Sequence, residues 1–131
     1  MKFLCILMLI FLPKISWAES TNYSIFSDLV QYTGSLDAYS SMCVKNFQAN
    51  IAEKELFVLI KALQVNAELN EQEIFNLRDK YFRIRKSTLS QLTQLGLAKK
   101  KNLCGNYLKV FNRFDKKKNE ALDKIEVLIN E

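Results

Sequence analysis

Proline is absent from the chain after Pro13, and this absence constrains the fold more than any other feature of the sequence. The rest of the chain contains three glycines, Gly34, Gly96 and Gly105. Proline and glycine are the residues that most often interrupt helices, so a long segment nearly free of both favours helix along its whole length. Leu, Lys, Glu and Ala, which have high helix propensity, are frequent in the same segment. The sequence therefore predicts an all-α fold.

The apolar residues of the first predicted helix recur at the spacing of one helix face. Their steps alternate between four and three residues, which places them on a single stripe of an α-helix. The stripe consists of Ile25, Leu29, Tyr32, Leu36, Tyr39 and Cys43. Gly34 lies inside this helix and is expected to weaken it by about 1 kcal/mol relative to Ala.

Helix starts are predicted where Asn is followed by Glu three residues later. Asn50 with Glu53 and Asn70 with Glu73 have the spacing of a capping box. Gly96 is expected to end the third helix in a left-handed conformation. The four predicted helices span residues 23–46, 51–68, 71–95 and 98–130.

Two of the predicted helices differ in how they should pack. Residues 56–60 are apolar, so the 51–68 helix is apolar on almost all sides and is expected to be the most buried. The 98–130 segment keeps one apolar stripe throughout, and the sequence leaves open whether it is one helix or two with a bend near residues 115–119. Because short connections make successive helices antiparallel neighbours, we expect an antiparallel up-down-up-down four-helix bundle.

Residues 1–18 have the pattern of a secretory signal peptide. A basic residue precedes an apolar core at residues 3–12, and Ser16 and Ala18 are the small residues of a cleavage site. A core this short does not span a bilayer, which needs roughly 20 residues. An uncleaved N-terminal anchor is the alternative. We expect an exported protein, periplasmic if its source is a bacterium and otherwise secreted, with one domain at residues 19–131 and no transmembrane segment after cleavage.

The predicted mature chain contains two cysteines, Cys43 and Cys104. An even cysteine count in an exported protein favours a disulfide. In an antiparallel bundle, Cys43 near the end of the first helix and Cys104 near the start of the fourth lie at the same pole. The sequence therefore predicts a bundle tied by one disulfide. Two reduced thiols or a two-cysteine metal site are the alternatives, and the absence of His and of a Cys-x-x-Cys motif argues against a metal.

Charge is divided unevenly along the chain. Residues 19–77 contain eight acidic and three basic residues, whereas residues 78–131 contain six acidic and fourteen basic residues. The basic part, above all residues 78–118, would attract lipid headgroups, a polysaccharide or an acidic protein. The alternative is that acidic and basic helices neutralise each other within the bundle. Nucleic acid is not favoured as a partner, because the alternating aromatic and basic residues match no RNA-binding motif.

Seven residues are the candidates for contact with an anion or a partner. Arg78 and Arg85 lie between two apolar stripes of the third helix, with Tyr81 beside them, so each guanidinium needs a carboxylate or an anionic ligand. A carboxylate of Asp28, Asp37 or Glu55 would give an ion pair, and otherwise the two arginines would form a small anion-binding cleft. The remaining candidates form a basic stripe on the last helix: Lys109, Arg113, Lys116 and Lys117.

The sequence contains no catalytic motif. It has no His, no phosphate-binding glycine loop, no nucleophile elbow, no calcium loop and no pair of catalytic acids. We therefore predict that the protein is not an enzyme and requires neither a metal nor a cofactor.

These observations predict a small exported helical-bundle protein that acts as a non-enzymatic binding module, with an envelope or extracellular protein as its partner. The first alternative is binding of an anionic lipid or polysaccharide by residues 78–118. The second is an enzyme that uses carboxylates, which would need two of them to converge in a deep cleft with shifted pKa values.

Overall fold

The computed structural model describes residues 21–130, which form five helices and contain no strand. The predicted signal peptide at residues 1–18 lies outside the described residues. The helices are α1 (Thr21–Cys43), α2 (Ala49–Leu63), α3 (Glu71–Thr93), α4 (Leu97–Gly105) and α5 (Tyr107–Ile129). The all-α prediction is confirmed. The predicted four-helix bundle is not confirmed, because five helices form and two of them occupy the 98–130 segment.

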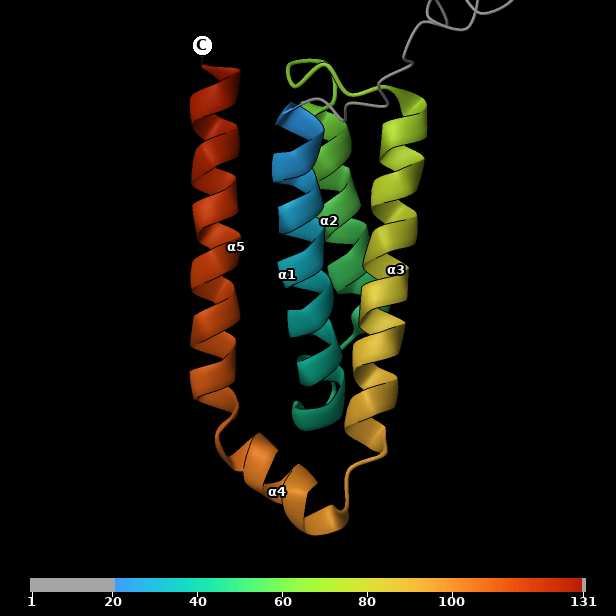
Figure 1. Ribbon diagram of the computed structural model, residues 1–131, viewed down its shortest axis with the longest axis vertical. Helices are drawn as coiled ribbons and strands as arrows, with labels where there is room; N and C mark the ends of the chain where they lie inside the picture. Colours follow the sequence, from blue (N-terminus) through green and yellow to red (C-terminus); the bar gives the residue numbers. More distant parts are fainter. Residues whose placement is uncertain (1–20, 131) are drawn as a thin grey trace, which may run out of the picture.

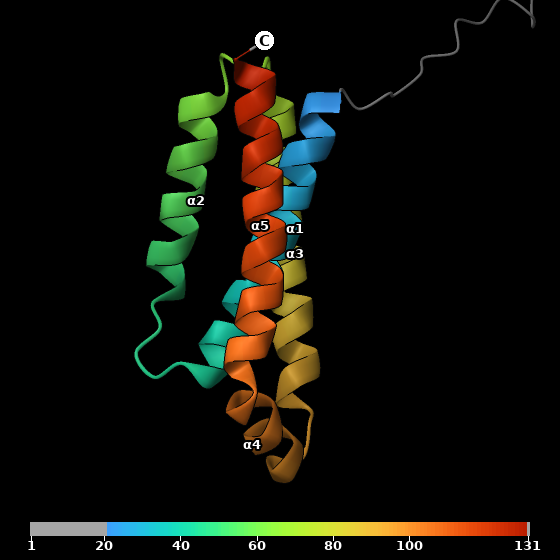
Figure 2. The ribbon, with the colours of Figure 1, turned by 90° about the vertical axis from the view of Figure 1, so that its left-hand side faces the viewer.

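The four longer helices run alternately up and down, and α4 crosses the lower end of the molecule (Figure 1). Helices α5, α1 and α3 form one layer with α1 in the middle, and α2 lies on one side of this layer (Figure 2). The most extensive packing is between α1 and its two neighbours in the layer. Helix α1 is therefore the central element of the fold.

The most buried helix is α1, whereas the sequence predicts the 51–68 helix. Phe26, Leu29 and Val30 of α1 are fully enclosed, because the helix has neighbours on several sides. Helix α2 buries one face only, and Val58 on its outer side is 61% exposed. An apolar sequence permits burial on every side, but α2 covers one side of a layer and no described helix lies outside it.

The last predicted helix breaks at Asn106 and not near residues 115–119. Asn106 has φ −101° and ψ 15°, which lies outside the helical range, and its side-chain amide donates to the Asn102 carbonyl at 3.0 Å. Gly105 and Asn106 are both weak helix formers. The chain turns back at this point, and the Tyr107 hydroxyl comes to lie 2.7 Å from Ser40 Oγ of α1.

One of the two predicted capping boxes forms. The Asn70 side chain accepts a hydrogen bond from the Glu73 amide at 2.8 Å, and the Glu73 carboxylate accepts one from the Asn70 amide at 3.1 Å. The other prediction is wrong, because α2 begins before Asn50 and encloses it. The prediction for Gly96 is also wrong: its φ is −62°, and it caps the start of α4.

The predicted disulfide between Cys43 and Cys104 is confirmed. Helix α1 ends at Cys43, and α4 brings Cys104 to the same pole of the molecule (Figure 1). Helix α4 has no buried residue of its own. The disulfide is therefore the main link that holds α4 to the layer.

Gly34 allows α1 and α3 to approach each other closely. A Cβ atom at this position would lie 3.2 Å from the Tyr81 carbonyl oxygen and 3.4 Å from Cγ2 of Ile84. The glycine that the sequence marks as a weak point of the first helix is thus a contact point between two helices.

We expect Gly34→Leu to lower the free energy of unfolding by about 1–2 kcal/mol. Overpacking costs about 1–3 kcal/mol, and the gain in helix propensity offsets less than about 1 kcal/mol of this. Urea unfolding measures the change. Gly105→Leu is the matched control, because an added Cβ there meets no atom within 4 Å. Equal destabilisation by the two substitutions would contradict the close approach at Gly34.

Candidate functional site

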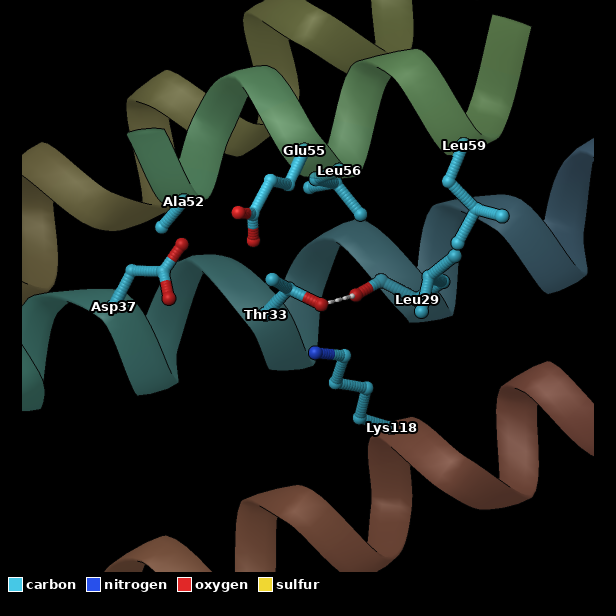
Figure 3. Close-up of a pocket in the computed structure, with 8 residues that line it drawn as sticks. All are labelled: Leu29, Thr33, Asp37, Ala52, Glu55, Leu56, Leu59 and Lys118. Carbon is cyan, nitrogen blue, oxygen red and sulfur yellow. Dashed lines mark hydrogen bonds between the residues drawn. The ribbon is translucent and has the colours of Figure 1, made fainter. Parts of the chain in front are cut away.

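A cleft of about 180 Å³ opens between α1, α2 and α5 (Figure 3). Helix α1 contributes three residues at a spacing of four, α2 contributes residues from one face, and α5 contributes a single lysine. The lining residues are Leu29, Thr33, Asp37, Ala52, Glu55, Leu56, Leu59 and Lys118. Leucines lie toward one end of the cleft and the Asp37 carboxylate lies toward the other (Figure 3).

Asp37 is the buried acid of this cleft. Its side chain is 6% exposed, and its carboxylate accepts a hydrogen bond from the Tyr81 hydroxyl of α3. Burial raises the pKa of Asp37, because the charged form loses its hydration, while the Tyr81 hydrogen bond and the charges of Lys118 and Arg85 oppose the shift. Burial and the same hydrogen bond raise the pKa of Tyr81. The phenol therefore stays protonated at neutral pH and donates to Asp37.

The other two charged side chains enter the cleft from α2 and α5. The Glu55 carboxylate points into the cleft from α2, and the Lys118 ammonium points toward Thr33 from α5 (Figure 3). The Thr33 hydroxyl donates to the Leu29 carbonyl at 2.7 Å, so it is already satisfied within α1. The cleft thus combines two acids and one base beside an apolar wall, a lining that suits ordered water or a small polar molecule.

The two carboxylates of the cleft have different environments. Asp37 is enclosed and hydrogen-bonded, whereas Glu55 is exposed. Catalytic pairs of carboxylates often differ in this way, because the enclosed acid holds its proton while the other stays charged. The carboxylate-enzyme alternative therefore stays a prediction that this geometry does not test.

The structure separates the two arginines of the predicted anion cleft. The Arg85 guanidinium lies 5.4 Å from the ring centroid of Tyr81 and 5.2 Å from that of Phe82. Its Nη1 atom is buried and has no hydrogen-bond partner in the described part of the chain. Arg78 faces α2, where its guanidinium lies 5.0 Å from the Phe57 ring centroid. Tyr81 and Arg85 are therefore neighbours, and Arg78 belongs to a different surface.

The four predicted basic residues of the last helix all lie exposed on the surface of α5: Lys109, Arg113, Lys116 and Lys117. The Arg113 guanidinium lies 5.2 Å from the Phe114 ring centroid. The Lys117 ammonium lies 5.8 Å from the ring centroid of Tyr32 on α1. These rings contact the cations without neutralising them, so the stripe remains positively charged.

The structure gathers further basic residues around the disulfide. Residues 38–52 and 86–114 meet at this pole of the molecule (Figure 1). The two segments contain no Asp or Glu and seven basic residues. These seven residues are called the cationic pole below: Lys45, Lys86, Lys99, Lys100, Lys101, Lys109 and Arg113.

Exposed apolar side chains lie among the residues of the cationic pole. Leu97 is 84% exposed and Leu108 is 72% exposed, and each is followed in sequence by a lysine within two residues. The ion pair that forms within residues 21–130 joins Arg83 and Asp79 of α3, at 3.4 Å. No described carboxylate therefore neutralises the pole by pairing with it.

Sequence reasoning missed both the cleft and the extent of the cationic pole. Asp37 and Glu55 are predicted only as possible ion-pair partners of the arginines, and Thr33 and Lys118 are absent from the predicted contact residues. Two polar residues four apart on a buried helix, together with a lysine on the apolar face of another helix, are the signal that could have indicated the cleft. A search for long segments without any acid would have indicated the pole.

No helix among residues 21–130 is both long and apolar enough to cross a membrane, and no three potential metal ligands gather in this part of the chain. Comparisons with protein families, curated proteins and solved structures find no match to this chain.

Proposed function

We propose that this protein is an exported, non-enzymatic binding module that docks end-on to an anionic lipid surface through its cationic pole. The observation that carries the proposal is that the two segments that meet at the disulfide, residues 38–52 and 86–114, contain seven basic residues and no acid. Each basic residue near an anionic membrane contributes about 1 kcal/mol of attraction. In this proposal the four long helices form the predicted antiparallel bundle, and α4 is a docking element added to it.

Charge at the opposite pole supports an end-on orientation. The connection between α2 and α3 and the first turn of α3 carry Glu68, Glu71 and Glu73, and the last part of α5 carries Glu126. An anionic surface therefore attracts the cationic pole more strongly than the opposite end, so the long axis would stand upright on it.

The exposed leucines favour a lipid surface over a polysaccharide. Leu97 and Leu108 project among the basic residues and have little contact with the rest of the molecule. A lipid surface binds both kinds of side chain, because it combines charged headgroups with an apolar interior. A polysaccharide would attract the lysines but would leave the leucines in water.

We expect the mature protein to sediment with vesicles of phosphatidylglycerol and phosphatidylcholine at low salt, and not with vesicles of phosphatidylcholine alone. Binding should weaken steeply with added salt, because the Debye length falls from about 30 Å at 0.01 M to about 8 Å at 0.15 M. Lys99→Gln with Lys100→Gln should lower the affinity about 30-fold, since two cations contribute about 2 kcal/mol together.

The matched control is Arg83→Gln with Lys124→Gln, which removes two positive charges outside the cationic pole. This control should change the affinity little. Leu97→Ser with Leu108→Ser should weaken binding without changing its dependence on salt. Failure to bind at low salt, or equal losses in the two charge variants, would exclude docking through the pole.

Capture of an envelope or extracellular protein is the competing outcome. If the vesicles do not bind and an acidic protein binds through the same lysines, the protein partner expected from the sequence replaces the lipid. Export is tested separately by sequencing the N-terminus of the secreted product, which we expect to begin at Glu19.

A further inference from the structure

A shallow groove of about 260 Å³ lies between α2 and α3 and has a basic lining. Lys54 and Lys61 reach it from α2, and Arg78 reaches it from α3. Glu53 is the single acid among the lining residues. Within residues 21–130 none of the three basic residues forms an ion pair. The groove therefore carries a net positive charge, and it shares no basic residue with the cationic pole.

The Arg78 guanidinium is positioned by the ring beneath it. It lies 5.0 Å from the Phe57 ring centroid, and the Phe57 side chain is 6% exposed, so the ring forms a fixed floor. A guanidinium that lies over an aromatic ring does not use its N–H groups for this contact. These donors remain available to an anion in the groove.

The α2 side of the groove combines charge with apolar surface. Lys54 and Lys61 are seven residues apart, so they lie two turns apart on one side of the helix. Val58 lies between them in sequence, lines the groove and is 61% exposed. A ligand between the two lysines would therefore contact an apolar side chain as well as two ammonium groups.

We propose that this groove binds a phosphate monoester that carries a small apolar or aromatic group. The phosphate oxygens would accept hydrogen bonds from the N–H groups of the Arg78 guanidinium, whose planar arrangement matches their geometry. They would also lie near the ammonium groups of Lys54 and Lys61. The organic group would pack against Val58 and the edge of Phe57. The net charge of the lining suits a dianion better than a carboxylate with a single charge.

Phenyl phosphate is the probe for this proposal. We expect it to shift the amide resonances of α2 and α3 around the groove in titrations of the mature protein. Inorganic phosphate should bind more weakly, because it lacks the apolar group. Arg78→Gln should lower the affinity for phenyl phosphate about tenfold, the loss expected when a charge-assisted hydrogen-bond donor is removed. Arg83→Gln, on the same helix but outside the groove, is the control and should leave the affinity unchanged.

A second variant keeps the Arg78 contact with Phe57 intact. Lys54→Gln with Lys61→Gln should also weaken phenyl phosphate binding, and it decides the question if Arg78→Gln fails to fold. The proposal is overturned if phenyl phosphate does not bind the wild-type protein. It is also overturned if neither folded groove variant binds more weakly than Arg83→Gln.

Vesicles of phosphatidic acid distinguish a lipid headgroup from a free ester as the source of the phosphate. They are tested on the protein with Lys99→Gln and Lys100→Gln, in which the cationic pole is weakened. Vesicle binding that depends on Arg78 identifies a lipid phosphomonoester. Binding of phenyl phosphate without Arg78-dependent vesicle binding identifies a free ester. Because the pole variant should still bind phenyl phosphate, this site can fail independently of the docking proposed for the pole.

Discussion

Removal of the Cys43–Cys104 disulfide is expected to lower the free energy of unfolding by about 4 kcal/mol. The two cysteines are separated by 61 positions in the sequence, so the bridge restricts a long loop of the unfolded chain. On the chain-entropy model, a loop of this length gives a stabilisation of about this size. Domains of this size are stable by about 5–15 kcal/mol, so the loss would be a large part of the total.

Urea unfolding of the variant Cys43→Ser with Cys104→Ser measures this effect. Adding a reductant to the wild-type protein should reproduce the loss, and adding it to the variant should change nothing. Hydrogen exchange should increase most in α4, because this helix has no buried residue and depends on the bridge. An unchanged free energy of unfolding, or labelling of both thiols in the unreduced protein, would contradict the prediction.

Tyr81→Phe is expected to lower the free energy of unfolding by about 3 kcal/mol at neutral pH, because it leaves a buried carboxylate without its hydrogen-bond donor. The phenyl ring keeps the edge-to-face contact with Phe57, whose centroid lies 5.6 Å away, so the loss reports on the hydroxyl. The cost should be smaller in acid, where Asp37 is protonated and carries no charge.

The stability of the protein should also depend on pH through Asp37 itself. Burial raises the pKa of Asp37 in the folded state above its ordinary value of 3.8, so the folded protein holds this proton more tightly than the unfolded chain does. The contribution of Asp37 to the free energy of unfolding is therefore greatest below pH 3.8. It decreases as the pH rises through the folded-state pKa and is constant above that.

Asp37→Asn isolates this contribution, because an asparagine can accept the Tyr81 hydrogen bond but does not ionise. Its free energy of unfolding relative to the wild-type protein should increase with pH above 3.8. In Asp37→Asn, the further substitution Tyr81→Phe should cost less than it does in the wild-type protein at neutral pH. Parallel pH profiles for the wild-type protein and Asp37→Asn would show that Asp37 has no raised pKa.

Local sequence patterns predicted the helical segments and one of their starts. The capping box at Asn70 forms because both partners lie within one turn of the same helix. The same pattern at Asn50 fails, since α2 begins at Ala49, two residues before the predicted start at residue 51. The positions of the cysteines predicted the bridge correctly. Short connections make successive helices antiparallel, and this places the end of the first helix and the start of the last segment at the same pole.

The candidate sites were predicted only in part. Arg78, Arg85 and the basic stripe of the last helix were named from their positions on helical faces. Their partners were not, because the aromatic rings of Phe57 and Tyr81 reach them through tertiary packing. The cleft beside Asp37 needs three helices, and no single stretch of sequence contains its lining.

The amino-acid sequence by itself determined that the chain is helical, which cysteines pair, and that positive charge is concentrated in the second half. These properties depend on helix propensity, residue spacing and composition, which can be read from the sequence without knowing how the helices pack. The tertiary structure alone decided that α1 and not α2 is enclosed, that the chain turns at Asn106, and that the basic residues meet at one pole. These outcomes depend on which helix faces come together. The helix faces are brought together by close contacts between residues distant in sequence, such as Gly34 and Tyr81.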